Sequence, residues 1–264
     1  MITPHHQLFI NSSVPVLRRD TRIIGVALGG SYIRREKMDE FSGLDFTLVI
    51  ADEAYDEVFA ERFEIAERLG TLLASFPGEH IHRPELLICM YDEPLMHVDL
   101  EFITTDMLRY RFENPVVVHQ QGSVITDALD KLPTRSTVPD LQWFEDRFWI
   151  WVHFIAGRIA RGEIFDSLES LSFLRLNVLG PLIMMKNGYA PRGVRNLERD
   201  CPDDARALTE TLAEYDQRSC LRALKAAANL YISLRGINKA SLFTRDLAES
   251  RALRYLNSIE AKLP

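Results

Sequence analysis

The feature that most constrains this chain is an apolar run that ends in two glycines and a serine. Residues 23–28 form the run, Gly29, Gly30 and Ser31 follow it directly, and a second apolar run covers residues 44–50. Both runs have the length and composition of buried strands. Glycines at a strand end let backbone N–H groups approach an anion closely, and the serine hydroxyl adds a donor. The pattern predicts two strands and a turn that can hold a phosphate group.

Strand alternation predicts a polar face on two strands. Asp45 and Thr47 point away from the apolar side of the second run, and Asp99 and Glu101 do the same in the run 96–104. If these strands are neighbours, three carboxylates converge, and they repel one another unless a cation lies between them. Magnesium takes hard oxygen ligands and shares its shell with substrate phosphates. The pattern therefore predicts a magnesium site with these four residues as candidate ligands, beside a nucleoside triphosphate.

The order of these motifs resembles the nucleotidyltransferase superfamily, whose pattern is Gly-Ser, a short spacer, Asp-x-Asp and a third carboxylate on a later strand. The stretch from Asp39 to Thr47, DEFSGLDFT, looks like the streptomycin-modifying branch of the aminoglycoside and lincosamide adenylyltransferases. Asp99, in the strand MHVDLEFI, fits the third carboxylate. The resemblance covers residues 22–104. It implies magnesium-dependent transfer of a nucleoside monophosphate, AMP from ATP first of all, to a hydroxyl of a small molecule such as an antibiotic.

The implied reaction gives the candidate residues their roles. Gly29, Gly30 and Ser31 would hold the outgoing phosphates, and Asp45 would bridge the metal ions. Asp99 would bind a second ion or accept the proton of the acceptor. Other candidates have a plain structural alternative: Arg34 and Arg35 either contact phosphate or form a solvated turn, and Glu145 either acts as general base, as the resemblance implies, or complements a helix dipole.

Thr47 departs from the commoner pattern, which has a carboxylate at this position. Three interpretations remain open: Thr47 ligates magnesium as it stands, Glu101 supplies the missing charge, or the site is degenerate. Two other function classes also stay open. One is a protein-modifying nucleotidyltransferase of the antitoxin type, and the other is a non-catalytic nucleotide-binding protein.

Composition is that of a globular protein. The 264 residues are 47% hydrophobic and 26% charged, and the net charge of -7 argues against a dedicated nucleic-acid binder, which usually carries a basic face. Cys89, Cys201 and Cys220 are widely spaced, which favours a reducing compartment over a disulfide framework. We see neither a signal-peptide pattern nor an apolar stretch of membrane-spanning length, so we expect a cytoplasmic protein without membrane partners. A homodimer is left open.

The periodicity of the chain changes near its middle. Strands are expected first and helices afterwards, which predicts an α+β fold: a nucleotidyltransferase-like mixed sheet with helices, then an all-helical C-terminal bundle. We assign residues 1–130 to a catalytic domain, 131–139 to a linker and 140–264 to a helical substrate-binding domain. Expected strands are 23–28, 44–50, 86–91 and 96–104, with a small strand or hairpin at 116–119 and 124–125. Expected helices are 1–20, 52–74, one from 141, and others near 166–186, 203–215, 217–235 and 245–261, with Trp143, Trp149 and Trp151 in the bundle core.

Overall fold

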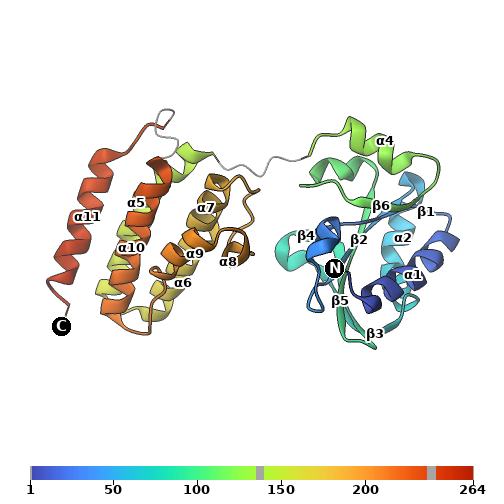
Figure 1. Cartoon of the computed structure of the whole chain (residues 1–264), viewed down its shortest axis with the longest axis horizontal. Coiled ribbons are helices and arrows are strands. Elements are labelled where there is room, and N and C mark those ends of the chain that lie inside the picture. The colour runs from blue at the N-terminus through green and yellow to red at the C-terminus, as the bar shows by residue number, and fades with distance from the viewer. Residues whose placement is uncertain (1, 135–139, 237–241, 264) are drawn as a thin grey trace. The chain divides into compact units, whose positions relative to one another are not determined.

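A computed structural model describes residues 2–134, 140–236 and 242–263 of the chain (Figure 1). The chain divides into two compact units, Met1–Ser136 and Thr137–Pro264, which we call the sheet unit and the helical unit. The division lies within the expected linker 131–139, of which residues 135–139 are outside the described residues. Each unit has a hydrophobic core of its own.

The sheet unit is built on one six-stranded mixed sheet, as the sequence predicted. Its order is β3-β4-β5-β2-β1-β6. β2 and β5 run parallel, and the other neighbouring pairs run antiparallel. Three strands coincide with the expected runs to the residue. The strands are β1 (Ile23–Leu28), β2 (Leu44–Ile50), β3 (Thr71–Gly78), β4 (Arg83–Asp92), β5 (Met96–Thr104) and β6 (Val116–Gln120).

One face of the sheet is covered by three helices. The apolar sides of β2 and β5 share a core with α1 (Pro4–Arg19), α2 (Tyr55–Ala60) and α3 (Arg62–Glu67). On the opposite face, α4 (Val124–Lys131) and the 3-10 turn η4 (Asp106–Tyr110) pack on Ala27, Val49 and Ile103. This second core covers the C-terminal ends of β2 and β5. The polar residues of the same strands lie on this face before Val49 and Ile103. The remaining 3-10 turns of the unit are η1 (Gly30–Lys37), η2 (Asp52–Ala54) and η3 (Glu79–Ile81).

Two expectations for this unit are wrong. The single helix expected over 52–74 is broken at Glu61, whose ψ of 2° is not helical, and it ends at Glu67. Residues 71–78 instead pair with β4 as the edge strand, so tertiary pairing overrides the helical spacing of the sequence. The expected strand at 124–125 is the first turn of α4. The side-chain oxygen of Gln120 accepts hydrogen bonds from the N–H groups of Ile125 and Thr126 and so starts a helix there.

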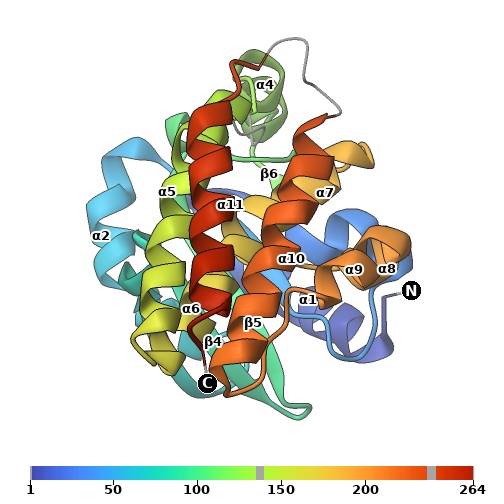
Figure 2. The ribbon, with the colours of Figure 1, turned by 90° about the vertical axis from the view of Figure 1, so that its left-hand side faces the viewer.

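The helical unit confirms the expected bundle. Its long helices α5, α10 and α11 lie side by side, and α6 packs on α5 and α10 (Figure 2). The helix expected over 203–215 ends at Thr209. The elements are α5 (Leu141–Ala160), α6 (Ile164–Leu174), a π-helical turn η5 (Arg175–Leu179), α7 (Gly180–Lys186), α8 (Leu197–Asp200), α9 (Pro202–Thr209), α10 (Gln217–Arg235) and α11 (Asp246–Glu260).

The tryptophans of this unit do not all enter its core. Trp149 is buried and lies edge-on to Phe148, which stacks on Tyr231 at 3.7 Å between ring centroids. Trp143 is 44% exposed, so the expectation of a core position is wrong for it, whereas Trp151 is half-buried and packs against the bundle core. Trp143 and Trp151 lie eight residues apart on α5 and contact each other, with 5.6 Å between ring centroids.

One stretch of the helical unit is longer and more apolar than we expected. Ile164–Lys186 is continuous helix with a mean hydropathy of 1.3, which by length and composition is enough to cross a membrane. Half of its apolar window is buried inside the unit. Side chains such as Leu171, Leu174, Val178 and Ile183 belong to the bundle core, and this burial accounts for the apolar composition.

Candidate functional site

The glycine turn, residues 29–31, packs directly on Asp45. Gly29 N–H donates to the Asp45 carbonyl at 2.8 Å, and Gly30 has a φ of 53°, in the left-handed region that favours glycine. A Cβ atom built on Gly30 would lie 2.0 Å from Asp45 Oδ2. A side chain on Gly30 would have to displace this carboxylate, so the backbone of the turn and the Asp45 side chain are close neighbours.

The parallel pairing of β2 and β5 brings the predicted polar residues together. Asp45 lies opposite Asp99, and Thr47 lies opposite Glu101. Partners in register on neighbouring strands point to the same face. Asp45, Thr47, Asp99 and Glu101 therefore share the face opposite the core formed with α1, α2 and α3, and we call them the polar sheet face.

Within this face, Glu101 is held by neighbours on both of its oxygens. Thr47 Oγ1 donates to Glu101 Oε2 at 3.2 Å, and Glu101 Oε1 forms an ion pair with Arg83. Arg83 Nε also lies 3.3 Å from Glu85 Oε1. Burial raises the pKa of Glu101, although the positive charge of Arg83 opposes the rise. Burial also disfavours the charged form of Arg83, but the two glutamates outweigh it and raise its pKa.

Arg83 is a site residue that the sequence reasoning missed. It opens β4, three residues before Leu86, the register partner of Glu101. The only signal in the sequence was an arginine and a glutamate, Arg83 and Glu85, just before an apolar strand. That signal does not indicate the neighbouring strand, so the contact with Glu101 was not predictable.

Asp99 has a different neighbour. Its Oδ1 lies 2.8 Å from His97 Nε2, two residues earlier on the same face of β5. His97 is largely exposed, with 62% of its side chain accessible, whereas 24% of the Asp99 side chain is accessible. The imidazole therefore covers one edge of the Asp99 carboxylate from the solvent side.

A cavity of about 670 Å³ in the sheet unit opens onto the glycine turn and most of the polar sheet face. Its walls combine charged groups with apolar side chains from the loops that flank the sheet. Such a mixture suits a ligand with a charged part and a flat apolar part. The polar lining includes Gly29, Gly30, Asp45, Thr47, Arg83, Glu85 and Glu101, and the apolar lining includes Ile81, Met107, Tyr110 and Phe112.

The other phosphate-binding candidates lie on η1. Arg34 and Arg35 are both exposed. The Arg35 guanidinium donates to Tyr32 Oη at 3.3 Å and lies over the Tyr32 ring, 5.2 Å from its centroid. Ser31 is half-buried at the start of the turn. A contact of these residues with phosphate stays a prediction.

Glu145 lies inside the helical unit and is 1% exposed. Its Oε1 accepts from Arg235 Nη1 at 2.7 Å, from the Arg245 N–H at 2.8 Å and from Trp149 Nε1 at 3.3 Å, and its Oε2 accepts from Tyr231 Oη at 2.7 Å. Burial alone would raise the pKa of Glu145, but these donors outweigh it and lower the pKa. A carboxylate held in this way joins α5, α10 and α11, which is a structural role.

Whether the sheet unit can hold a metal ion depends on which of its side chains could act as ligands. Among the residues that the structure describes, no group of three or more His, Cys, Asp and Glu side chains is arranged to hold a metal ion. Asp45 and Asp99 nevertheless offer two carboxylates in register next to the glycine turn. Magnesium is commonly held by one or two carboxylates together with substrate phosphates. These two residues fit that arrangement, and Glu101 beside them forms an ion pair with Arg83.

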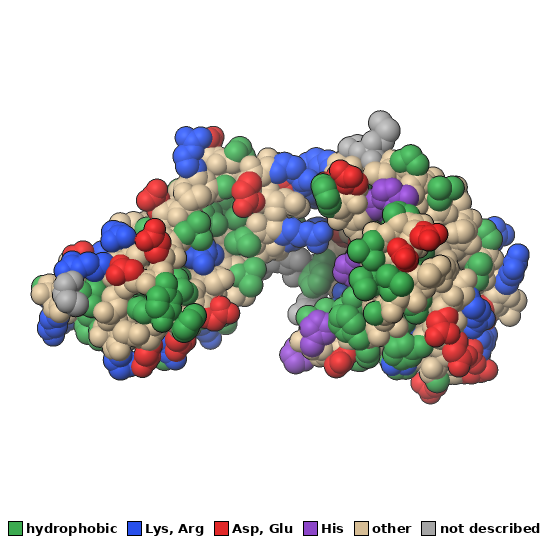
Figure 3. Space-filling model, turned by 90° about the horizontal axis from the view of Figure 1, so that it is seen from below, with side chains coloured by type: hydrophobic (Ala, Val, Ile, Leu, Met, Phe, Trp, Pro, Cys, Tyr) green, Lys and Arg blue, Asp and Glu red, His purple; other side chains and the backbone are tan. Residues whose placement is uncertain are grey.

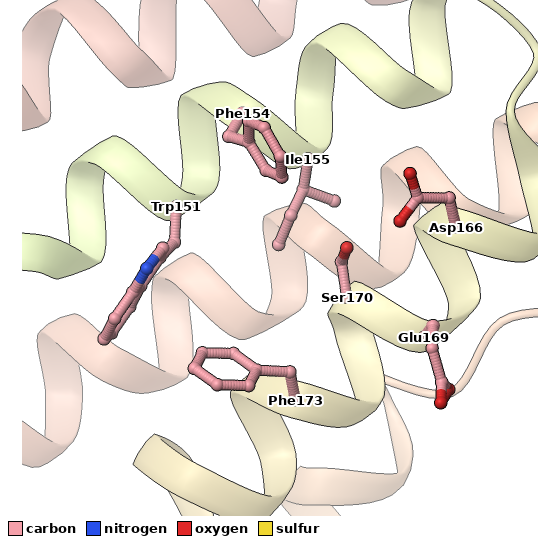
Figure 4. Close-up of a pocket in the computed structure, with 7 residues that line it drawn as sticks. All are labelled: Trp151, Phe154, Ile155, Asp166, Glu169, Ser170 and Phe173. Atoms are coloured by element: carbon pink, nitrogen blue, oxygen red, sulfur yellow. The ribbon is translucent and has the colours of Figure 1, made fainter.

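A second cavity, of about 310 Å³, lies in the helical unit between α5 and α6 (Figure 4). Trp151 and Phe173 form one wall and meet edge to face at 5.3 Å between centroids. Asp166 and Glu169 lie at the other end (Figure 4). On the face of this unit seen in Figure 3, acidic and basic side chains are interspersed rather than gathered by sign. The aromatic wall and the two carboxylates of the cavity are therefore a local feature of this unit.

Comparison with known proteins gives matches in structure alone. No protein-family model matches the chain, and no curated protein is similar to it in sequence. The chain is similar to the crystal structure of an aminoglycoside 6-adenyltransferase from Bacillus subtilis, with 17% identity, a TM-score of 0.44, and coverage of 98% of this chain and 99% of that one. It is also similar to a nucleotidyltransferase-like protein from Exiguobacterium sibiricum, with 12% identity, a TM-score of 0.42, and coverage of 94% and 78%. At these TM-scores the likeness adds no weight to any residue assignment.

Proposed function

We propose that the sheet unit is a nucleotidyltransferase that moves a nucleoside monophosphate, AMP from ATP in the first instance, to a hydroxyl of a small molecule. The observation that carries the proposal is the contact of Gly30 with Asp45, in a cavity, beside the register pair of Asp45 and Asp99. A backbone turn that can receive phosphate and a carboxylate pair that can receive magnesium are thereby neighbours. Triphosphate chemistry needs both in one place.

The reaction is an in-line displacement at the α-phosphorus. The acceptor oxygen forms a bond to that phosphorus, and the bond from the α-phosphorus to the oxygen that bridges to the β-phosphate breaks. The bonding electron pair leaves with this oxygen on pyrophosphate, and the hydroxyl proton passes to solvent. Magnesium, when bound, would neutralise charge on the phosphate oxygens during this displacement.

The position of each residue in the site indicates the role that we propose for it. The N–H groups of Gly30 and Ser31 and the Ser31 hydroxyl would hold the departing phosphates, since the Gly29 N–H already donates to the Asp45 carbonyl. Asp45 and Asp99 would hold magnesium through their carboxylate oxygens, and His97 would orient Asp99. Tyr110 and Phe112 are exposed apolar side chains of the same cavity and would contact the base.

The helical unit is proposed as the substrate-binding part of the chain. Its cavity between α5 and α6 joins an aromatic wall to the carboxylates of Asp166 and Glu169 (Figure 4). Such a lining suits an organic molecule that carries positive charge. An antibiotic is one acceptor of this kind, and the motif resemblance is the reason to test antibiotics first.

A second candidate function is non-catalytic nucleotide binding. The ion pair between Glu101 and Arg83 favours it, because this pair removes one carboxylate from the charge available to metal ions. A protein acceptor, as in the antitoxin type, is the remaining alternative for an active enzyme. A non-catalytic protein would release no pyrophosphate. An active enzyme would release it, and either a small molecule or a protein would gain the mass of one nucleoside monophosphate.

The test measures ATP binding with and without magnesium, and then pyrophosphate release against a panel of hydroxyl acceptors. Mass spectrometry of the acceptors should show the gain of one nucleoside monophosphate. Asp45→Asn should abolish release, whereas Asp56→Asn, an exposed aspartate of α2, should leave it unchanged. Magnesium-dependent binding without release from any acceptor would select the non-catalytic function. The absence of any binding would refute both.

A further inference from the structure

We infer that Arg83 replaces a second metal ion, so that the polar sheet face binds a single magnesium with the triphosphate. The inference rests on the proposed function and concerns which groups supply positive charge at its site. It starts from the closed arrangement of Thr47, Glu101 and Arg83, in which the hydroxyl and the guanidinium occupy different oxygens of one carboxylate.

Asp45 and Asp99 are the carboxylate pair proposed to hold magnesium, and Glu101 lies next to them on the same face. Two-metal sites hold their ions roughly 3.5–4 Å apart, with carboxylates shared between them. Glu101 lies two residues beyond Asp99 on the same face, so it is the residue that would extend the ligand set towards Thr47. Arg83 already neutralises Glu101 there. A second dication at this end would meet a fixed positive charge and a hydroxyl that brings no charge of its own.

Arg83 also has the donors that a triphosphate requires. It lines the same cavity as Gly29, Gly30 and Asp45. Its Nε faces Glu85 and its Nη2 faces Glu101, while within the described residues its Nη1 has no acceptor. The guanidinium is therefore anchored on one side and can donate from the other, and planar guanidinium groups bind phosphate oxygens well. Two glutamates fix the position of the charge before the nucleotide arrives.

The experiment counts metal ions rather than turnover. Mn²⁺ would be titrated into the full chain in the presence of saturating α,β-methylene ATP, in which the scissile bond cannot break. Electron paramagnetic resonance would measure how much Mn²⁺ is bound. Wild type should bind one tight Mn²⁺ per chain. Arg83→Gln should bind two, because Glu101 becomes available, and nucleotide affinity should fall by roughly ten- to a hundredfold through the loss of charge-assisted hydrogen bonds.

Three controls make the result specific. Arg83→Lys keeps the charge and should still bind one ion. Arg83→Gln combined with Glu101→Gln should return to one ion. Arg109→Gln, which removes an exposed arginine of η4 that pairs with Asp106, should match wild type in both measurements.

The outcomes separate this inference from the function beneath it. Two tight ions in wild type, or one ion in a folded Arg83→Gln variant, would overturn the role of Arg83 while leaving nucleotidyl transfer standing. The absence of any Mn²⁺-dependent nucleotide binding would overturn the proposed function and this inference together. Circular dichroism of each variant establishes that the fold is retained, and Arg83→Lys tests the charge if Arg83→Gln does not fold.

Discussion

Gly30 and Asp45 are packed so closely that a Cβ atom on Gly30 would lie 2.0 Å from the Asp45 carboxylate oxygen Oδ2. The turn between β1 and η1 is thus shaped around the acidic group of the next strand. This single contact links the phosphate-binding and metal-binding halves of the candidate site, and the first two predictions address its two residues.

Gly30→Ala should weaken ATP binding. The added methyl group must displace the Asp45 carboxylate or the turn, and the left-handed φ of 53° adds about 1–2 kcal/mol of strain. Isothermal titration with ATP and magnesium measures the effect. Gly122→Ala is the matched control, because Gly122 has a φ of 57° but open space around its Cβ position. Equal affinities for the two variants would place the phosphate site elsewhere.

Asp45→Asn should abolish nucleotidyl transfer without unfolding the protein. The amide keeps the shape of the carboxylate but removes the charge that magnesium requires, which raises the barrier by several kcal/mol. Pyrophosphate release and thermal unfolding are measured side by side. A folded variant that turns over at a rate close to wild type would contradict the metal assignment.

Thr47→Val and Glu101→Gln should not have additive effects on stability. Thr47 donates to Glu101 in the native state, so removal of either partner disrupts the same hydrogen bond. A double-mutant cycle by urea denaturation should give a coupling free energy of roughly 0.5–3 kcal/mol. Additivity within about 0.3–0.5 kcal/mol would show that the two side chains act independently.

Glu145→Gln should destabilise the helical unit by about 3–5 kcal/mol, because it leaves the Arg235 charge partly unpaired in a buried site. Denaturant unfolding followed by tryptophan fluorescence measures the loss. Tyr231→Phe removes one donor to the same carboxylate and should cost less. A Glu145→Gln variant as stable as wild type would remove the structural role assigned to this residue.

Acid should weaken the same network. The donors around Glu145 lower its pKa below the ordinary value of 4.5, so the folded state binds this proton less readily than the unfolded state. The stabilisation is complete above pH 4.5 and is lost as the pH falls through the lower pKa of the folded state. The free energy of unfolding of wild type should therefore fall below this pH more steeply than that of Glu145→Gln. Parallel pH profiles would contradict the assignment.

The sequence alone determined the bounds of β1, β2 and β5 and the face of β2 and β5 that carries the polar residues. In β2 and β5, period-two alternation separates Asp45 and Asp99 from apolar neighbours, and each boundary falls where the apolar run ends. It also predicted the helical second half, because three-to-four spacing in α5 and α10 is a local property of the chain.

Tertiary structure decided which strands are neighbours and which charges meet. Alternation fixes the face of a side chain but not its register, so the pairing of Asp45 with Asp99 depended on a long-range contact. The same is true of Arg83 on Glu101, which needs the antiparallel register of β4 and β5. The helix expected over 52–74 gave way to an edge strand because residues 71–78 pair with β4, a long-range contact that the local helical spacing does not encode. Local patterns specify which side chains are presented, and the free energy of packing and pairing distant segments specifies what they contact.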